Sequence, residues 1–116
     1  MATIKSHTDI GQSRLLAKFL PIESADMCYI GENNALTVDY LSAKKEFDAT
    51  KEVDIFPCWS LAALLSILHD YTLQTNTDGT VFVVCESKKP MISDAYDNPV
   101  DACVAMIEKL HKLKLL

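Results

Sequence analysis

Apolar side chains recur at helical spacing over residues 97–116, and this pattern predicts one amphipathic helix. Asn98 suits the N-cap, and Pro99 suits the first helical position, where its missing N–H costs no hydrogen bond. The apolar positions form one broad stripe, made of Val100, Cys103, Val104, Ile107 and Leu110. We expect this helix to be the best-specified element of the fold and to bury the stripe against the core.

Two further helices are predicted earlier in the chain. Leucines and a phenylalanine recur at helical spacing over residues 10–20, with Asp9 available as a cap and Pro21 as a stop. The run from Leu61 to Leu68 is apolar on nearly every side, and Ser60 can cap it. A helix of that composition is buried on most sides, so we expect it to form the centre of the core.

Two β-hairpins are predicted between these helices. In the first, residues 27–30 and residues 36–41 flank a turn that contains glycine and asparagine, both of which tolerate positive φ. In the second, residues 71–75 and residues 80–87 flank the sequence Asn-Thr-Asp-Gly. Residues 81–85 are all apolar, which predicts a central strand covered on both faces.

Four shorter segments complete the predicted fold. Residues 1–8 are interpreted as a loose tail, and residues 42–52 as either a solvated linker or a short exposed helix. Residues 53–56 and residues 91–93 suit brief extended segments. The elements follow the order helix, hairpin, helix, hairpin, helix. With about three helices packed on a small antiparallel sheet of two hairpins, the chain is expected to be a single α+β domain over residues 1–116.

Composition narrows the possible classes of function. The 116-residue chain is acidic, with 16 Asp and Glu against 11 Lys and Arg and a net charge of −5, and the excess is spread along its length. The sequence holds no basic stripe, which disfavours nucleic-acid binding. It also holds no apolar run of the length that spans a bilayer and no secretory signal, so we expect a cytoplasmic protein without membrane contact.

The four cysteines are widely separated and form no C-x-x-C pair, so reduced thiols are the expected state. Cys85 and Cys103 lie at apolar positions and are interpreted as small buried side chains. Cys58 lies just before the predicted central helix, where a thiolate would have a lowered pKa and could act as a nucleophile with His7 or His69 as its base. Since no sequence signature surrounds Cys58, a structural role is the favoured interpretation.

No metal or other cofactor is predicted. The histidines lie far apart, and no H-x-x-x-H or C-x-x-C spacing places two ligands on one turn. Gly11, Gly31 and Gly79 form no G-x-G phosphate loop. Asp94 and Asp97 are close in sequence, but solvated loop and capping groups are the favoured interpretation for both.

Three stretches of sequence carry a resemblance to a known group of proteins. They are residues 14–29, with Arg14-Leu15-Leu16 and Met27-Cys28-Tyr29 at their ends; residues 56–65, FPCWSLAALL; and residues 96–111, which begin YDNPVDAC. The chain resembles small proteins encoded by phages, prophages and other mobile elements of gut Bacteroidales. That group has no assigned activity, cofactor or catalytic residue, so the resemblance implies a biological setting and no chemistry. The chain departs from the group at Leu68-His69-Asp70, where similar sequences have Leu-Pro, so this proline stop for the central helix is missing.

We expect a non-enzymatic accessory protein of a phage or mobile element that acts by binding an unknown protein partner. The candidate interaction surface comprises Lys44, Lys45, Glu46, Asp48, Asp94, Tyr96, His111 and Lys114. One alternative is an acidic inhibitor that mimics nucleic acid and blocks a host DNA-binding enzyme, which would need a contiguous acidic face. A second alternative is a cysteine-dependent enzyme that uses Cys58. Open hairpin edges predict a monomer or a weak homo-oligomer.

Overall fold

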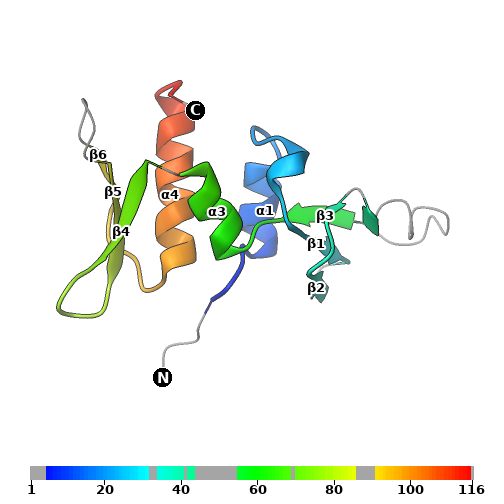
Figure 1. Ribbon diagram of the computed structural model, residues 1–116, viewed down its shortest axis with the longest axis horizontal. Helices are drawn as coiled ribbons and strands as arrows, with labels where there is room; N and C mark the ends of the chain where they lie inside the picture. The colour runs from blue at the N-terminus through cyan, green and yellow to red at the C-terminus, as the bar shows by residue number, and fades with distance from the viewer. Residues whose placement is uncertain are drawn as a thin grey trace.

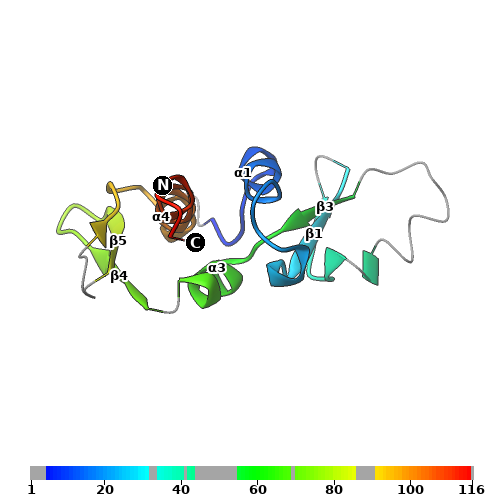
Figure 2. The same ribbon diagram turned by 90° about the horizontal axis from the view of Figure 1, so that it is seen from above.

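The computed structural model describes residues 5–31, 34–40, 42–43, 55–68, 70–85 and 91–115. The molecule measures 47 × 36 × 18 Å along its principal axes. Within the described ranges, three α-helices occupy the middle of the long axis, and a small antiparallel sheet lies toward each end (Figure 1 and Figure 2). The predicted α+β class is confirmed, but the strands form two sheets rather than one.

The helices begin at the caps that the sequence predicts. They are α1 (Ile10–Leu16), the short 3-10 helix η1 (Ile22–Ser24), α3 (Leu61–Ile67) and α4 (Pro99–Lys112). Asp9 Oδ1 accepts from the Gln12 N–H at 2.8 Å, and Gln12 Oε1 accepts from the Asp9 N–H at 3.1 Å, which makes a capping box for α1. Asn98 Oδ1 accepts from the Asp101 N–H at 2.9 Å and caps α4. Ser60 caps α3.

The first helix ends earlier than its apolar pattern suggests. The N–H groups of Lys18 and Phe19 donate to the carbonyls of Leu15 and Leu16, three positions back, at 3.2 and 3.1 Å. Hydrogen bonds of this 3-10 type tighten the last turn and end the α-helix ahead of Pro21. The predicted first helix is therefore confirmed with a shorter span.

Both predicted hairpins are present, but the strand predicted over residues 36–41 in the first hairpin is wrong beyond Leu36. The observed strand is Asn34–Leu36, and residues 37–40 that follow it are bend, coil and helical backbone. The first sheet has the order β2-β1-β3 and the second the order β4-β5-β6, with antiparallel pairing throughout. The strands are β1 (Met27–Ile30), β2 (Asn34–Leu36), β3 (Ile55–Cys58), β4 (Tyr71–Thr75), β5 (Val81–Cys85) and β6 (Met91–Ile92). The first hairpin closes earlier than predicted, because Gly31 takes a φ of 69° directly after β1 and Ile30 then pairs with Asn34.

β3 and β6 lie close to the two extended segments that the sequence predicts. Pro57 lies within β3, which has a neighbour on one side only, and a sheet edge is where a residue without an N–H is tolerated. The extended segment predicted over residues 53–56 is found at Ile55–Cys58, and residues 53–54 lie outside the described chain. β6 (Met91–Ile92) confirms the extended segment predicted over residues 91–93 to within one residue. Of residues 42–52, for which the sequence predicts a linker or a short exposed helix, only Ser42 and Ala43 are described; both are helical, and Ala43 is buried.

The helices cover only one face of the β4-β5-β6 sheet, so the prediction that β5 is covered on both faces is wrong. Val81, Val83 and Cys85 are buried, whereas Phe82 and Val84 between them are partly exposed. Figure 2 shows α4 and α3 on the same side of this sheet. The sheet therefore has a core face and an outer face.

α3 is also less enclosed than its composition predicts. Ala63 and Leu64 are buried, but Ala62 and Ser66 are exposed. The centre of the core is α4 instead, since α4 packs against β5, α3 and α1. α3 forms an outer wall of the core because its apolar residues meet α4 from one side.

The apolar stripe predicted along α4 is confirmed. Val100, Cys103 and Ile107 are completely buried, and Leu110 is 2% exposed. Met106, at the edge of the stripe, is completely buried as well. α4 therefore contributes a nearly continuous apolar surface to the main core.

Residues 5–8 are not part of a loose tail, contrary to the prediction for residues 1–8. Thr8 is completely buried, and its N–H donates to the Trp59 carbonyl at 2.9 Å. The Ser6 carbonyl accepts a second backbone hydrogen bond, of 3.0 Å, from the first residue of α3. These bonds hold the segment against the β3–α3 junction. The first four residues of the chain lie outside the described part.

Ile107→Asp is expected to unfold the domain, because a carboxylate would be buried without a partner in the middle of the α4 stripe. Ile107→Ala should lower the free energy of unfolding by about 2–5 kcal/mol, and the exposed Lys112→Ala by less than about 0.5 kcal/mol. Thermal unfolding followed by circular dichroism measures all three variants. A wild-type melt for Ile107→Asp would contradict this packing of α4.

Candidate functional site

Cys58 is the candidate nucleophile of the cysteine-enzyme alternative, and the fold buries it. Its side chain is 0% exposed at the end of β3. Its Sγ donates to the Thr8 carbonyl at 3.5 Å and lies 3.6 Å from Thr8 Oγ1. Burial raises the pKa of the thiol, and hydrogen bonds with Thr8 and Ser13 only partly oppose that rise. The thiol is therefore protonated at neutral pH, unlike an activated nucleophile.

The N-terminus of α3 is occupied by other groups. Ser60 Oγ accepts from the Ala63 N–H at 3.2 Å. The Asp26 carboxylate accepts from the Ser60 N–H at 2.9 Å and from the Ser60 hydroxyl. A cap and a carboxylate thus already satisfy the positive end of this helix, and Cys58 takes no part there.

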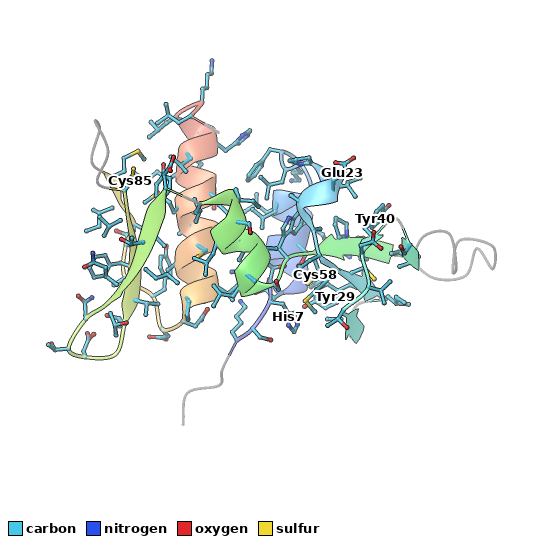
Figure 3. All side chains as sticks on the ribbon, in the orientation of Figure 1. His7, Glu23, Tyr29, Tyr40, Cys58 and Cys85 are labelled. Atoms are coloured by element: carbon cyan, nitrogen blue, oxygen red, sulfur yellow. The ribbon has the colours of Figure 1, made fainter. Side chains whose placement is uncertain are left out.

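Thr8 is the centre of a buried polar network next to Cys58. Its hydroxyl lies 2.8 Å from Ser13 Oγ and accepts from the Trp59 N–H at 3.1 Å. Its carbonyl accepts from the Tyr29 hydroxyl at 2.8 Å. Figure 3 shows Tyr29 and Cys58 close together at this point, on neighbouring strands β1 and β3. Each hydroxyl of the network has a partner within it, so the network is a structural junction between elements.

His7, one of the two histidines considered as a base for Cys58, contacts groups other than the thiol. The ring of His7 meets Tyr29 edge to face with centroids 6.0 Å apart, and its Nδ1 lies 3.1 Å from Ser6 Oγ. No hydrogen bond joins His7 to Cys58 among the described residues. His69 lies outside them. The geometry therefore favours a structural role for Cys58.

Of the residues predicted to form an interaction surface, Asp94, Tyr96, His111 and Lys114 lie in the described part of the chain. Lys44, Lys45, Glu46 and Asp48 lie outside the described residues. Asp94 is exposed. Tyr96 is a structural residue in part, because its carbonyl and N–H pair with Val81 at 2.7 and 2.8 Å and its side chain packs on the core.

His111 lies in the last turn of α4 and Lys114 just beyond its end, about 20 Å from the Asn98 cap for a helix of this length. The His111 ring stacks on Phe19, with centroids 4.0 Å apart and planes 9° from parallel. Lys114 is exposed and takes a φ of 58°. The stacked pair joins the end of α4 to the turn after α1, so His111 has a structural contact at this position.

An open hollow of about 360 Å³ between α1 and α4 contains a cluster of charged and polar side chains. Asp101 accepts from Lys5 Nζ at 2.8 Å, Gln12 Nε2 at 2.7 Å and Asn98 Nδ2 at 2.8 Å. Burial by itself would raise the pKa of Asp101, but these three hydrogen bonds outweigh it and the pKa lies below its usual range. Burial likewise opposes the charge on Lys5, but its bonds to Asp101 and Asp9 raise its pKa. The cluster joins the N-terminal segment, α1 and α4.

A second open hollow, of about 490 Å³, lies between η1 and α3. Two of the polar groups that line it already form hydrogen bonds within the protein. Asp26 accepts from Ser60, and Ser24 Oγ accepts from Trp59 Nε1 at 2.9 Å. The described residues that line the two hollows bring no cysteine or histidine together with another reactive group.

The sequence interpretation missed a surface that we call the outer sheet face, made of Thr72, Gln74, Phe82, Val84 and Ile92. Strand register places Val84 opposite both Thr72 and Ile92, and Phe82 opposite Gln74. Ile92 is 55% exposed. The sequence signal for this face is the alternation of apolar and polar residues in β4, which is typical of a sheet with one face on the core and one in solvent.

Three comparisons bear on the identity of the site. No protein-family model, no curated protein and no solved structure matches the chain. Within the described ranges, no three His, Cys, Asp or Glu side chains gather where a metal ion could be held. None of the helices in that part of the chain has the length and apolarity to cross a membrane.

The four thiols are expected to react slowly with iodoacetamide in the native protein at neutral pH. Cys28, Cys58, Cys85 and Cys103 are all buried, and burial raises the pKa of Cys103 to about 12. In urea, all four should label at the rate of free thiols. Mass spectrometry after a timed pulse measures both states. Native labelling of Cys58 at the urea rate would favour the cysteine-enzyme alternative.

Asp101→Asn is expected to reduce stability at pH 7 by about 1 kcal/mol, because the ion pair with Lys5 is partly exposed. The folded-state pKa of Asp101 is lowered, so its contribution is complete above the unfolded-state value of about 3.9 and is lost as the pH falls below it. The difference between wild type and Asp101→Asn should therefore shrink between about pH 5 and pH 2. Urea unfolding at each pH measures it, and the exposed Glu23→Gln serves as control. A difference that is constant with pH would contradict the role of the ionised pair.

Proposed function

We propose that the protein is a non-enzymatic accessory protein that binds a protein partner through the outer sheet face. The observation that carries the proposal is the row formed by Phe82, Val84 and Ile92, apolar side chains that remain partly or largely exposed on adjacent strands. Thr72 and Gln74 border this row and are polar but uncharged. An exposed apolar row of this kind is typical of an interaction surface.

The chemistry of the two long strands favours an apolar protein surface as the partner. β4 and β5 contain no charged residue, although 23% of the chain is charged and its net charge is −5. Loss of charge at the centre of an interface is the compositional mark of protein–protein recognition. A nucleic acid would need lysine or arginine side chains against its phosphates, and these strands supply none.

The biological setting belongs to the same proposal. The resemblance to mobile-element proteins supports a phage or prophage origin, and the four free cysteines are compatible with a reducing cytoplasm. The candidate surface over residues 44–48 remains a prediction, because it lies outside the described chain. Binding through the outer sheet face needs no cofactor.

The alternative of an acidic nucleic-acid mimic receives less support. The carboxylates of Asp9 and Asp101 each form an ion pair with Lys5 Nζ, at 2.9 and 2.8 Å. Asp26 is bound to Ser60. These carboxylates are partly neutralised or already hydrogen-bonded, whereas a mimic of phosphates needs a row of free negative charges.

The proposal is tested by quantitative affinity capture from cells that carry the parent mobile element. Val84→Lys should reduce recovery of the partner about tenfold or more, because it places a charge in the apolar row. Ser66→Lys, on the exposed side of α3, adds the same charge elsewhere and should leave recovery unchanged. Circular dichroism and thermal unfolding of both variants establish that each is folded before capture.

Binding of the captured protein to purified wild type and variants is then measured by calorimetry. A partner that binds the wild type and Ser66→Lys equally, but Val84→Lys at least about tenfold more weakly, supports the proposal. A partner that binds all three equally overturns the outer sheet face as the site. A DNA-binding enzyme that is displaced by duplex DNA and is insensitive to Val84→Lys would support the mimic instead.

A further inference from the structure

β4 is an edge strand of the second sheet, and its register leaves some of its backbone groups pointing away from the sheet. On the other side of β5, the N–H and carbonyl of Val81 pair with Tyr96. The Val83 carbonyl accepts from the Ser93 N–H at 2.9 Å, and the Val83 N–H donates to Ser93 Oγ at 2.8 Å. The backbone of Phe82 therefore points toward β4.

Because the direction of the backbone groups alternates along an antiparallel pair, Thr72 and Gln74 use theirs on β5. Leu73 and Thr75 consequently direct their N–H and carbonyl groups outward from the edge. Within the described part of the chain, these outward groups have no hydrogen-bond partner. The Tyr71 N–H is already used, because it donates to the Leu68 carbonyl at 2.9 Å.

The β4 edge lacks the features that block other edges of this molecule. β3 carries Pro57 along its length. At β6, Lys109 Nζ donates to the Ile92 carbonyl at 3.1 Å and so occupies an edge acceptor. The sequence of β4, Tyr-Thr-Leu-Gln-Thr, contains no lysine, proline or glycine. Exposed strands without such features are templates for pairing with another strand.

We propose that β4 pairs antiparallel with β4 of a second copy of this chain, about a two-fold axis at Leu73. This register places Leu73 opposite Leu73 of the second copy and Tyr71 opposite Thr75. Four backbone hydrogen bonds then form: each Leu73 N–H donates to the other Leu73 carbonyl, and each Thr75 N–H donates to a Tyr71 carbonyl. The occupied Tyr71 N–H is not needed.

Pairing two copies of β4 in this register matches hydrogen-bond donors with acceptors and brings no two like charges together. Thr72 lies opposite Gln74 of the second copy, and Asp70, just before β4, lies opposite Asn76 rather than another acid. The two sheets would join into one of six strands, with the two outer sheet faces side by side. The inference uses the backbone of β4 alone and is independent of the function proposed above, which uses side chains of the outer sheet face.

Thr75→Pro tests the proposal. It removes the outward N–H while leaving the bonds between β4 and β5 in place, since an edge proline with its nitrogen toward solvent is tolerated. Thr75→Ala is the matched control, because it keeps the N–H. Sedimentation velocity over about 1 µM to 1 mM should show a concentration-dependent dimer for the wild type and Thr75→Ala, and dimerisation about tenfold or more weaker for Thr75→Pro.

Hydrogen exchange of the wild type keeps the test decisive if Thr75→Pro does not fold. The Leu73 and Thr75 amides should exchange more slowly at high than at low protein concentration, while the Thr72 and Gln74 amides are protected at both. Added salt should strengthen the dimer, since both copies carry a net charge of −5. A wild type that is monomeric throughout the range, or a dimer whose Leu73 and Thr75 exchange is independent of concentration, overturns the proposal.

Discussion

Hydrogen bonds at Trp59 fix how the first sheet, which ends at β3, meets the helical core, which begins at α3. Its indole is completely buried, and its Nε1 donates to Ser24 Oγ at 2.9 Å. Its backbone N–H donates to Thr8 Oγ1 at 3.1 Å, and its carbonyl accepts from the Thr8 N–H at 2.9 Å. Trp59 alone separates β3 from the Ser60 cap of α3, so these bonds set the direction in which the chain leaves the first sheet. Moving the indole would leave buried polar groups without partners.

From Trp59, the elements follow one another along the long axis of the molecule. α4 lies between the β4-β5-β6 sheet on one side and α3 and α1 on the other, and the β2-β1-β3 sheet continues beyond α1 (Figure 1). Each helix therefore contributes one apolar side to a shared core. The second sheet lies at an end of this arrangement, so its core face meets α4 while Phe82 and Val84 remain on its outer face.

Local sequence signals predicted most of the elements, because caps and apolar periodicity act within a few residues. Asp9, Ser60 and Asn98 all cap the predicted helices, and the α4 stripe is buried. The outer sheet face and the anchored N-terminal segment were missed because they depend on contacts between distant parts of the chain. Thr8 and Cys58 are 50 positions apart, and no local pattern shows that they meet. Whether β5 is covered on one face or two depends likewise on where α4 and α3 pack.

The buried polar side chains in the described part of the domain are hydrogen-bonded to one another or to the backbone, so groups that could bind a partner must lie at the surface. Among the described residues, no buried side-chain nitrogen or oxygen lacks a hydrogen-bond partner. Both proposed binding surfaces lie on the second sheet, and β4 contributes to each. The side chains of Thr72 and Gln74 border the outer sheet face, whereas the backbone of Leu73 and Thr75 forms the edge. Because one surface uses side chains and the other uses main-chain groups in a different direction, each can be occupied without blocking the other.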